Sequence, residues 1–69
     1  MIAAVRALVA ELHGPVGDDD RLDLESLTLV LLMEAMEDRW GVKLSVSDLV
    51  PEHFESVRAI AHLVELRAP

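Results

Sequence analysis

Apolar residues recur at intervals of three and four along most of this sequence, which is the spacing of helices that bury one face. No alternating run of apolar and polar residues is long enough to favour a strand. The pattern therefore predicts an all-α fold, a small bundle of three main helices plus one short helix. We expect the main helices to cover Ile2 to Leu12, Ser26 to Arg39 or Trp40, and the stretch that begins at Ser56.

Residues that cap or interrupt helices mark the expected ends. Gly14 and Pro15 end the first helix, because glycine can take the left-handed cap conformation and proline cannot continue a helix. Gly41 ends the second helix, and Ser56 is a good N-cap for the last one.

Between the last two main helices, Ser45 and Asp48 resemble a capping pair. They predict one short helical turn near residues 47–50, and we expect a further turn or loop over residues 51–55.

The loop before Ser26 carries three consecutive aspartates at positions 18–20. We expect them to stay solvated near the positive amino end of the helix that follows. Val16 and Leu22 are the apolar residues that we expect to anchor this loop.

The helical stripes also predict which side chains form the core. Met33 falls on the inward stripe of the second helix with Met36, and both are interpreted as core filler. Trp40 is interpreted as a plug that locks the end of that helix. The predicted core is Leu29, Leu32, Met36, Trp40, Ile60 and Val64, with Val57 and Ala61 also buried on the last helix, and Val5, Leu8, Val9 and Leu12 on the first.

Size and charge restrict the function. With 69 residues, the chain is expected to form one domain, residues 1–69, close to the smallest size that folds without disulfides or metals. It has no cysteine, which excludes disulfides and thiolate metal sites. The 13 acidic residues against 6 basic ones give a net charge of −7, which disfavours nucleic acid and anionic membranes and suits a monomer whose partners present basic surfaces.

The remaining composition argues against a membrane or metal protein. The first 14 residues are too short to span a bilayer and lack the features of a signal peptide, so a cytoplasmic location is expected. His13, His53 and His62 show no metal-ligand spacing, so no metal site is predicted.

Ser26 stands where the aspartate-rich loop meets the second helix. A serine at a helix start usually caps it, but Asp23 could cap this helix instead and leave the hydroxyl of Ser26 free. No histidine or lysine lies close in sequence to act as a base, and so short a chain cannot easily build an oxyanion pocket. Any chemistry at Ser26 must therefore be performed by another enzyme, and no catalytic residue is predicted.

Three features resemble the acyl, aminoacyl and peptidyl carrier proteins, which are small acidic helical bundles. Glu25-Ser26-Leu27 lies where the family has an aspartate–serine–leucine motif, and Trp40-Gly41-Val42 closes the helix about fourteen residues later. The later run SDLVPEHFESVRAIAHLVE is similar to the family's short third helix and its fourth helix. The resemblance covers nearly the whole chain.

The resemblance implies a cofactor and partners. Ser26 would be esterified by the 4′-phosphopantetheine of coenzyme A, transferred by a phosphopantetheinyl transferase that uses magnesium. The arm would hold an acyl or aminoacyl group as a thioester, and Leu27 would pack beside it. Loading and downstream synthases, ligases or adenylating enzymes would be the other partners.

Two departures from the family pattern are visible. Glu25 replaces the usual aspartate and keeps its charge, but it is a poorer helix cap, a role that Asp23 could take over. The loop between the first two helices is shorter than is typical of the family, which leaves less lining for a buried acyl chain and argues against long fatty acyl cargo.

The outward face of the second helix is mixed in character. Leu27, Thr28, Val30 and Leu31 are uncharged, whereas Glu34, Glu37 and Asp38 follow one or two turns later. We expect partners to dock on the apolar part around Leu27, Val30 and Leu31 and to be oriented by the acids. This mix resembles carriers of specialised metabolism or aminoacyl transfer.

Two alternatives stay open from the sequence. One is an unmodified acidic adaptor that binds a partner protein and never carries an arm. The other is a small catalytic domain, which the missing base and pocket disfavour.

Overall fold

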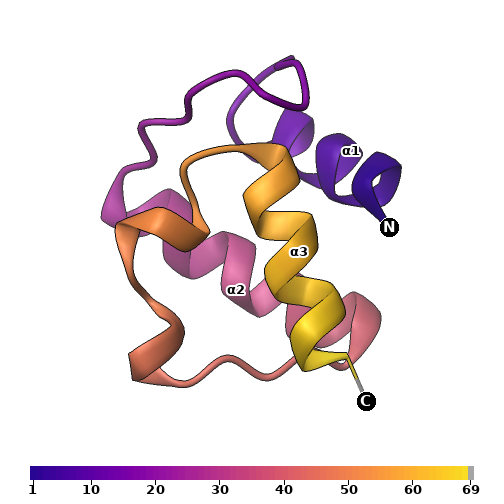
Figure 1. The fold of residues 1–69 in the computed structure, drawn as a ribbon, viewed down its shortest axis with the longest axis vertical. Helices are drawn as coiled ribbons and strands as arrows, with labels where there is room; N and C mark the ends of the chain where they lie inside the picture. The colour runs from indigo at the N-terminus through magenta and orange to yellow at the C-terminus, as the bar shows by residue number, and fades with distance from the viewer. Residues whose placement is uncertain (69) are drawn as a thin grey trace.

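A computed structural model describes residues 1–68 and contains helices and connecting loops, with no strand in that range. The main helices are α1 (Ile2–Leu12), α2 (Ser26–Trp40) and α3 (Val57–Arg67). Two short 3₁₀ helices, η1 (Val46–Asp48) and η2 (Pro51–His53), lie between α2 and α3. Figure 1 shows α3 crossing in front of α2, and α1 packs against both of them. The predicted all-α bundle is confirmed, with two short helices where the sequence predicted one.

The helix ends lie where the capping residues predicted them. After α1, Gly14 has a φ of 125° and its N–H donates to the carbonyl of Ala10 at 3.1 Å. Gly41 takes the left-handed conformation, φ 67°, and its N–H donates to the carbonyl of Glu37 at 2.9 Å. Since glycine enters this region without steric cost, it can end a helix while satisfying the last carbonyls.

The first short helix begins one residue earlier than the predicted turn. η1 opens with a capping box, in which the Ser45 N–H donates to Oδ2 of Asp48 at 3.1 Å and the Ser45 hydroxyl faces the amide of residue 48. The pairing of Ser45 with Asp48 that the sequence suggested is therefore confirmed.

The core lies between one face of each main helix. Leu32, Met36, Ile60 and Val64 are buried as predicted, while Leu29 and Trp40 are partly buried and pack against the core. The buried apolar set is Val5, Leu8, Val9, Leu22, Leu32, Met36, Val42, Phe54, Val57, Ile60, Ala61, Leu63 and Val64.

Met33 was wrongly predicted as a core residue. It is only partly buried and does not belong to the core cluster. Each residue turns about 100° around a helix axis, so Met33 is displaced from the line through Leu32 and Met36 toward the edge of the buried face.

The aspartate loop docks against α3, not against the amino end of α2 as predicted. Asp19 accepts two hydrogen bonds from the guanidinium of Arg58, at 2.6 and 3.1 Å, and Arg58 lies in the first turn of α3. The backbone N–H of Arg58 donates to the carbonyl of Asp18 at 3.0 Å. The loop thereby satisfies one of the free amides at the start of α3.

Further contacts hold the same loop in place. The carboxylate of Asp18 pairs with Arg6 of α1 at 2.7 Å. The N–H of Leu22 donates to the carbonyl of Glu55 at 2.8 Å, and the Leu22 side chain is buried. Val16 is partly buried against the core, so both predicted anchors of the loop are confirmed.

Asp48 is the one buried charged residue of the described chain, with 3% of its surface exposed. Arg67, at the end of α3, donates to both oxygens of its carboxylate over distances of 2.8 to 3.2 Å. The hydrogen bonds from Arg67, followed by the one from the Ser45 N–H, hold the pKa of Asp48 far below its usual value of 3.8.

Leu32→Ala tests how much this small core can lose. Truncating a buried leucine costs about 2–5 kcal/mol, and a domain of this size has a free energy of unfolding of roughly 5 kcal/mol in total. We expect a largely unfolded or molten chain by circular dichroism. A cooperative thermal melt close to that of the wild type would show that this face of α2 is not buried.

Acid titration tests the buried carboxylate. Because the pKa of Asp48 is lower in the folded chain than in the unfolded chain, its stabilisation is complete above pH ~5 and is lost as the pH falls. The melting temperature of Asp48→Asn should therefore fall less between pH 5 and pH 3 than that of the wild type. Glu65→Gln, at an exposed site outside the described ion pairs, is the control and should keep the wild-type slope. Equal slopes for Asp48→Asn and the wild type would contradict the assignment.

Candidate functional site

Ser26 is the first residue of α2, and its side chain is exposed. The N-cap is Glu25, in an extended conformation with φ −70° and ψ 156°, and it makes no side-chain capping hydrogen bond. Within residues 1–68, the side-chain hydrogen bonds involve neither Ser26 nor Asp23. The prediction that Asp23 caps this helix is therefore wrong, but the hydroxyl of Ser26 is free, as expected.

Ser56 at the start of α3 shows what a capping serine does in the same chain. Its hydroxyl accepts a hydrogen bond from the N–H of Ala59 at 3.1 Å, and Ser56 is the N-cap. Ser26 instead lies one position inside its helix, where the hydroxyl cannot make this bond. The first amide groups of α2 consequently face solvent beside the free hydroxyl, at the positive end of the helix dipole.

The surface next to Ser26 is apolar. Leu27 is 68% exposed, and Val30 and Leu31 follow at 48% and 43%. Thr28, which was predicted on this outward face, is half-buried because its position on the helix turns it toward the core. The other uncharged residues lie on the face as predicted.

The acidic part of the outward face is also exposed. Glu34, Glu37 and Asp38 all lie on the surface of α2. The basic residue of this helix, Arg39, pairs with Glu11 of α1 at 3.0 Å. Since Arg39 is engaged with α1, it does not neutralise the three acids, and this end of α2 presents net negative charge.

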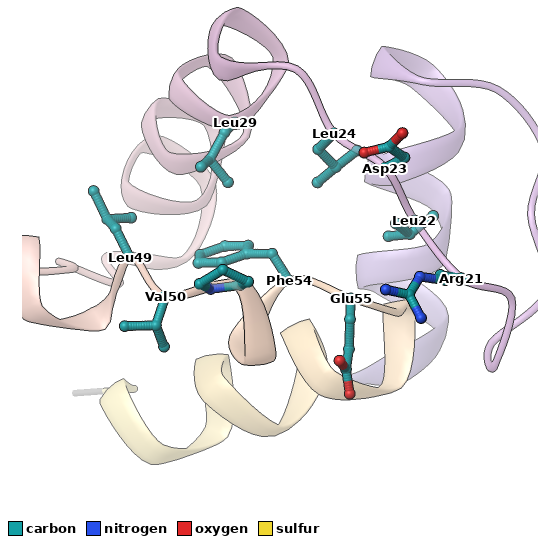
Figure 2. A pocket seen from close by; sticks show the side chains of 10 residues that line it. Arg21, Leu22, Asp23, Leu24, Leu29, Leu49, Val50, Phe54 and Glu55 are labelled. Atoms are coloured by element: carbon teal, nitrogen blue, oxygen red, sulfur yellow. The ribbon is translucent and has the colours of Figure 1, made fainter.

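A cleft of about 370 Å³ opens beside the amino end of α2. In Figure 2, Leu24 and Leu29 lie on one side of the cleft, with Leu49, Val50 and Phe54 across from them. The charged side chains of Arg21, Asp23 and Glu55 also line it, and the carboxylate of Glu55 points away from the apolar residues. Leu24 precedes Ser26 by two residues and Leu29 follows it by three, so this side of the cleft lies at the same end of α2 as the free hydroxyl.

Sequence reasoning did not identify this cleft. Leu22 and Leu24 alternate with charged residues in the extended segment before α2, a spacing that places both leucines on one side of the chain. That alternation was the available signal. The opposite wall comes from residues 49–54, and only the folded chain brings the two walls together.

Within residues 1–68, no three histidine, aspartate or glutamate side chains gather as a metal ion would need. None of the helices in this range has the length and apolar character required to cross a bilayer.

The family model described as the phosphopantetheine attachment site matches residues 3–64. The chain belongs to the phosphopantetheine attachment-site family. No curated protein and no solved structure matches the chain. Members of this family carry a 4′-phosphopantetheine prosthetic group and serve as carriers, and carrier domains of this kind are not themselves catalytic. The resemblance noted in the sequence is confirmed by this match.

Carrier domains of this family generally work with phosphopantetheinyl transferases and with synthase partners. The exposed face of α2 and the free hydroxyl at its start are the features of this chain that such partners could use.

Proposed function

We propose that residues 1–69 form one carrier domain in which Ser26 holds the 4′-phosphopantetheine arm. The observation that carries this proposal is the exposed hydroxyl of Ser26 in the first turn of α2, with no protein partner among the described residues. A hydroxyl is the group that a phosphodiester link requires. The free amides and the dipole at this helix end favour an attached phosphate.

The neighbouring residues fit the arm in two ways. Leu27 is exposed directly beside Ser26 and offers an apolar contact. Glu25 lies directly before Ser26 in extended backbone, and its carboxylate enters no described ion pair or capping bond. When bound, the arm supplies a terminal thiol that can carry a cargo as a thioester, which none of this chain's own side chains can do because it has no cysteine.

The cleft supports a cargo of modest size. At about 370 Å³ it lies near the lower end of the range for small-molecule pockets, and its walls are mostly leucine, valine and phenylalanine. A short apolar acyl group, or an aminoacyl group with an apolar side chain, would bury its surface there. We propose that the protein is a carrier in specialised metabolism or aminoacyl transfer. It would act in the cytoplasm as a monomer.

Partner enzymes are proposed to dock on the outward face of α2. The apolar contact would come from Leu27, Val30 and Leu31. Glu34, Glu37 and Asp38 would orient a basic partner by long-range attraction, which raises the association rate more than the affinity. No base lies in contact with Ser26 among the described side chains, so the domain is proposed to be acted upon and not to catalyse.

The mass of the protein after incubation with coenzyme A, magnesium and a broad-specificity phosphopantetheinyl transferase tests the proposal. We expect the wild type to gain one phosphopantetheine and Ser26→Ala to gain none, because Ser45, Ser47 and Ser56 lack the Glu-Ser-Leu context. Retained modification of Ser26→Ala would refute the site. A wild type that gains nothing would favour the unmodified adaptor.

Ser56→Ala is the matched control for that experiment. It should still accept the arm but lose about 1 kcal/mol of stability, since Ser56 caps α3. Ser26→Ala should keep the wild-type melting temperature within a degree or two, because Ser26 makes no capping bond.

Leu31→Glu tests the docking face. It adds a charge to the apolar patch without touching the core, so we expect the same transferase to modify it about tenfold more slowly, with an unchanged thermal melt. Leu66→Glu, on the exposed surface of α3 at 59% exposure, is the control and should be modified normally.

The dependence of binding on salt distinguishes the contribution of the apolar residues of this face from that of its acids. Raising ionic strength should slow association but leave most of the affinity, because the apolar contact is not screened. Normal modification of Leu31→Glu together with loss of binding in salt would show that the partner reads charge alone.

A further inference from the structure

One wall of the cleft is the loop of residues 48–54, which is folded back on itself by a hydrogen bond to the backbone of Asp48. Leu49, Val50 and Phe54 line the cleft from this wall. The backbone carbonyl of Asp48 lies 2.7 Å from Nδ1 of His53, the residue just before Phe54. A carbonyl can only accept, so Nδ1 of His53 carries the proton and donates it. Residues 48–53 therefore form a ring that begins and ends at Asp48.

The side chain of the same residue ties the ring to the end of α3. Arg67 lies 19 residues further along the chain and donates through Nε and Nη2 to the carboxylate of Asp48. The side chain of Asp48 is only 4% exposed, whereas that of Arg67 is 46% exposed. A two-point pairing of this kind fixes the relative orientation of the guanidinium and the carboxylate as well as the distance between them, because both groups are planar.

The other described ion pairs differ from this one. The pair of Arg39 with Glu11 is about half exposed on both sides, and that of Arg58 with Asp19 is more exposed still. Exposed pairs of this kind contribute little to stability. The buried carboxylate of Asp48 depends on its partner, since an unpaired buried charge is costly.

The pairing of Arg67 with Asp48 matters for the cleft because the loop that carries Leu49, Val50 and Phe54 is held against α3. η2 packs against α3. Leu29 of α2 faces the wall across the cleft (Figure 2). Because η2 packs on α3, the position of Leu49 and Val50 opposite Leu29 depends on how α3 holds this loop.

We propose that Asp48 and Arg67 are positioning residues that set the width of the cleft and thereby the retention of apolar cargo. This inference rests on the proposed function, in which the cleft shelters a group carried from Ser26. Without Arg67 the carboxylate loses the donors that hold it in place, and its movement toward water would carry Leu49 and Val50 away from Leu29. Cargo in the widened cleft would be reached more easily by solvent.

The test compares two cargoes on the full chain. Hexanoyl and acetyl groups are loaded by transferring the corresponding acyl-phosphopantetheine to Ser26, and thioester cleavage by hydroxylamine is then followed. The nitrogen of hydroxylamine attacks the thioester carbonyl and loses a proton, and the sulfur leaves and gains one, giving a hydroxamate and the free thiol. The hexanoyl group offers the cleft an apolar chain to bury, whereas the acetyl group offers almost none and is the unprotected reference.

In the wild type, hexanoyl should be cleaved more slowly than acetyl. In Arg67→Met, which keeps an apolar stem of similar length, this protection should fall by at least about tenfold, because the hydrogen bonds from Nε and Nη2 to Asp48 are lost. Arg67→Lys should recover part of it. Arg39→Met, which breaks the pair with Glu11, should retain full protection. General unfolding would also expose the hexanoyl group, so cleavage is compared at a temperature at which circular dichroism shows each variant to be folded.

Measurements on the unmodified protein separate this inference from the proposed function. Methyl resonances of Leu29, Leu49 and Val50 should shift in Arg67→Met and in Asp48→Asn but not in Arg39→Met. If these resonances stay at their wild-type positions, or if the hexanoyl-to-acetyl ratio is unchanged in Arg67→Met, the positioning role is overturned. If the wild type accepts no arm, the carrier proposal fails. The methyl shifts then still decide whether Asp48 and Arg67 position the wall of the cleft. Should Arg67→Met fail to fold, Asp48→Asn supplies both measurements.

Discussion

Burial of the apolar face of α3 is the interaction on which the other elements depend. Ile60 and Val64 are fully enclosed in the middle of this helix, and α1 packs along it. The two long loops are tied to its opposite ends, the aspartate loop through Arg58 and the η1 segment through Arg67. α3 thus serves as the frame of the domain, and α2 is left with one face free for other molecules.

The serines at the starts of α2 and α3 have different roles, and this difference explains the position of the candidate site. The hydroxyl of Ser56 caps α3, because it accepts a hydrogen bond from the N–H of Ala59. The serine of α2 lies one position further into its helix and keeps its hydroxyl available. Position relative to the helix end, rather than residue type, separates a capping serine from one with a free hydroxyl in this chain.

The sequence predicted the parts of the fold that local rules control. The bounds of α1 and α2, the glycine at position 41 and the capping pair of Ser45 with Asp48 follow from spacing and residue type within a few positions. The docking of the aspartates on α3 could not be predicted in the same way. Asp19 and Arg58 are 39 residues apart, and a charge pattern read along the chain does not reveal such a partner.

The same distinction holds for the candidate site. Ser26, its apolar neighbours and the acids of α2 all lie on one helix, so helical geometry was enough to place nearly all of them. Met33 and Thr28 lie at the edges of the buried face, where a 100° step per residue leaves the direction ambiguous. The cleft required two loops to meet, and neither loop has a regular period from which their approach could be inferred.

The missing cap at the start of α2 has a consequence for how this end of the helix moves. A side-chain cap normally adds about 1 kcal/mol to the first turn of a helix. Without it, the amides around Ser26 open to solvent more readily than those around Ser56, and their hydrogen exchange should be correspondingly faster. Under the proposed function, an enzyme that draws the hydroxyl of Ser26 into its own active site would meet a turn that opens at low cost, while α3 keeps the rest of the domain in place.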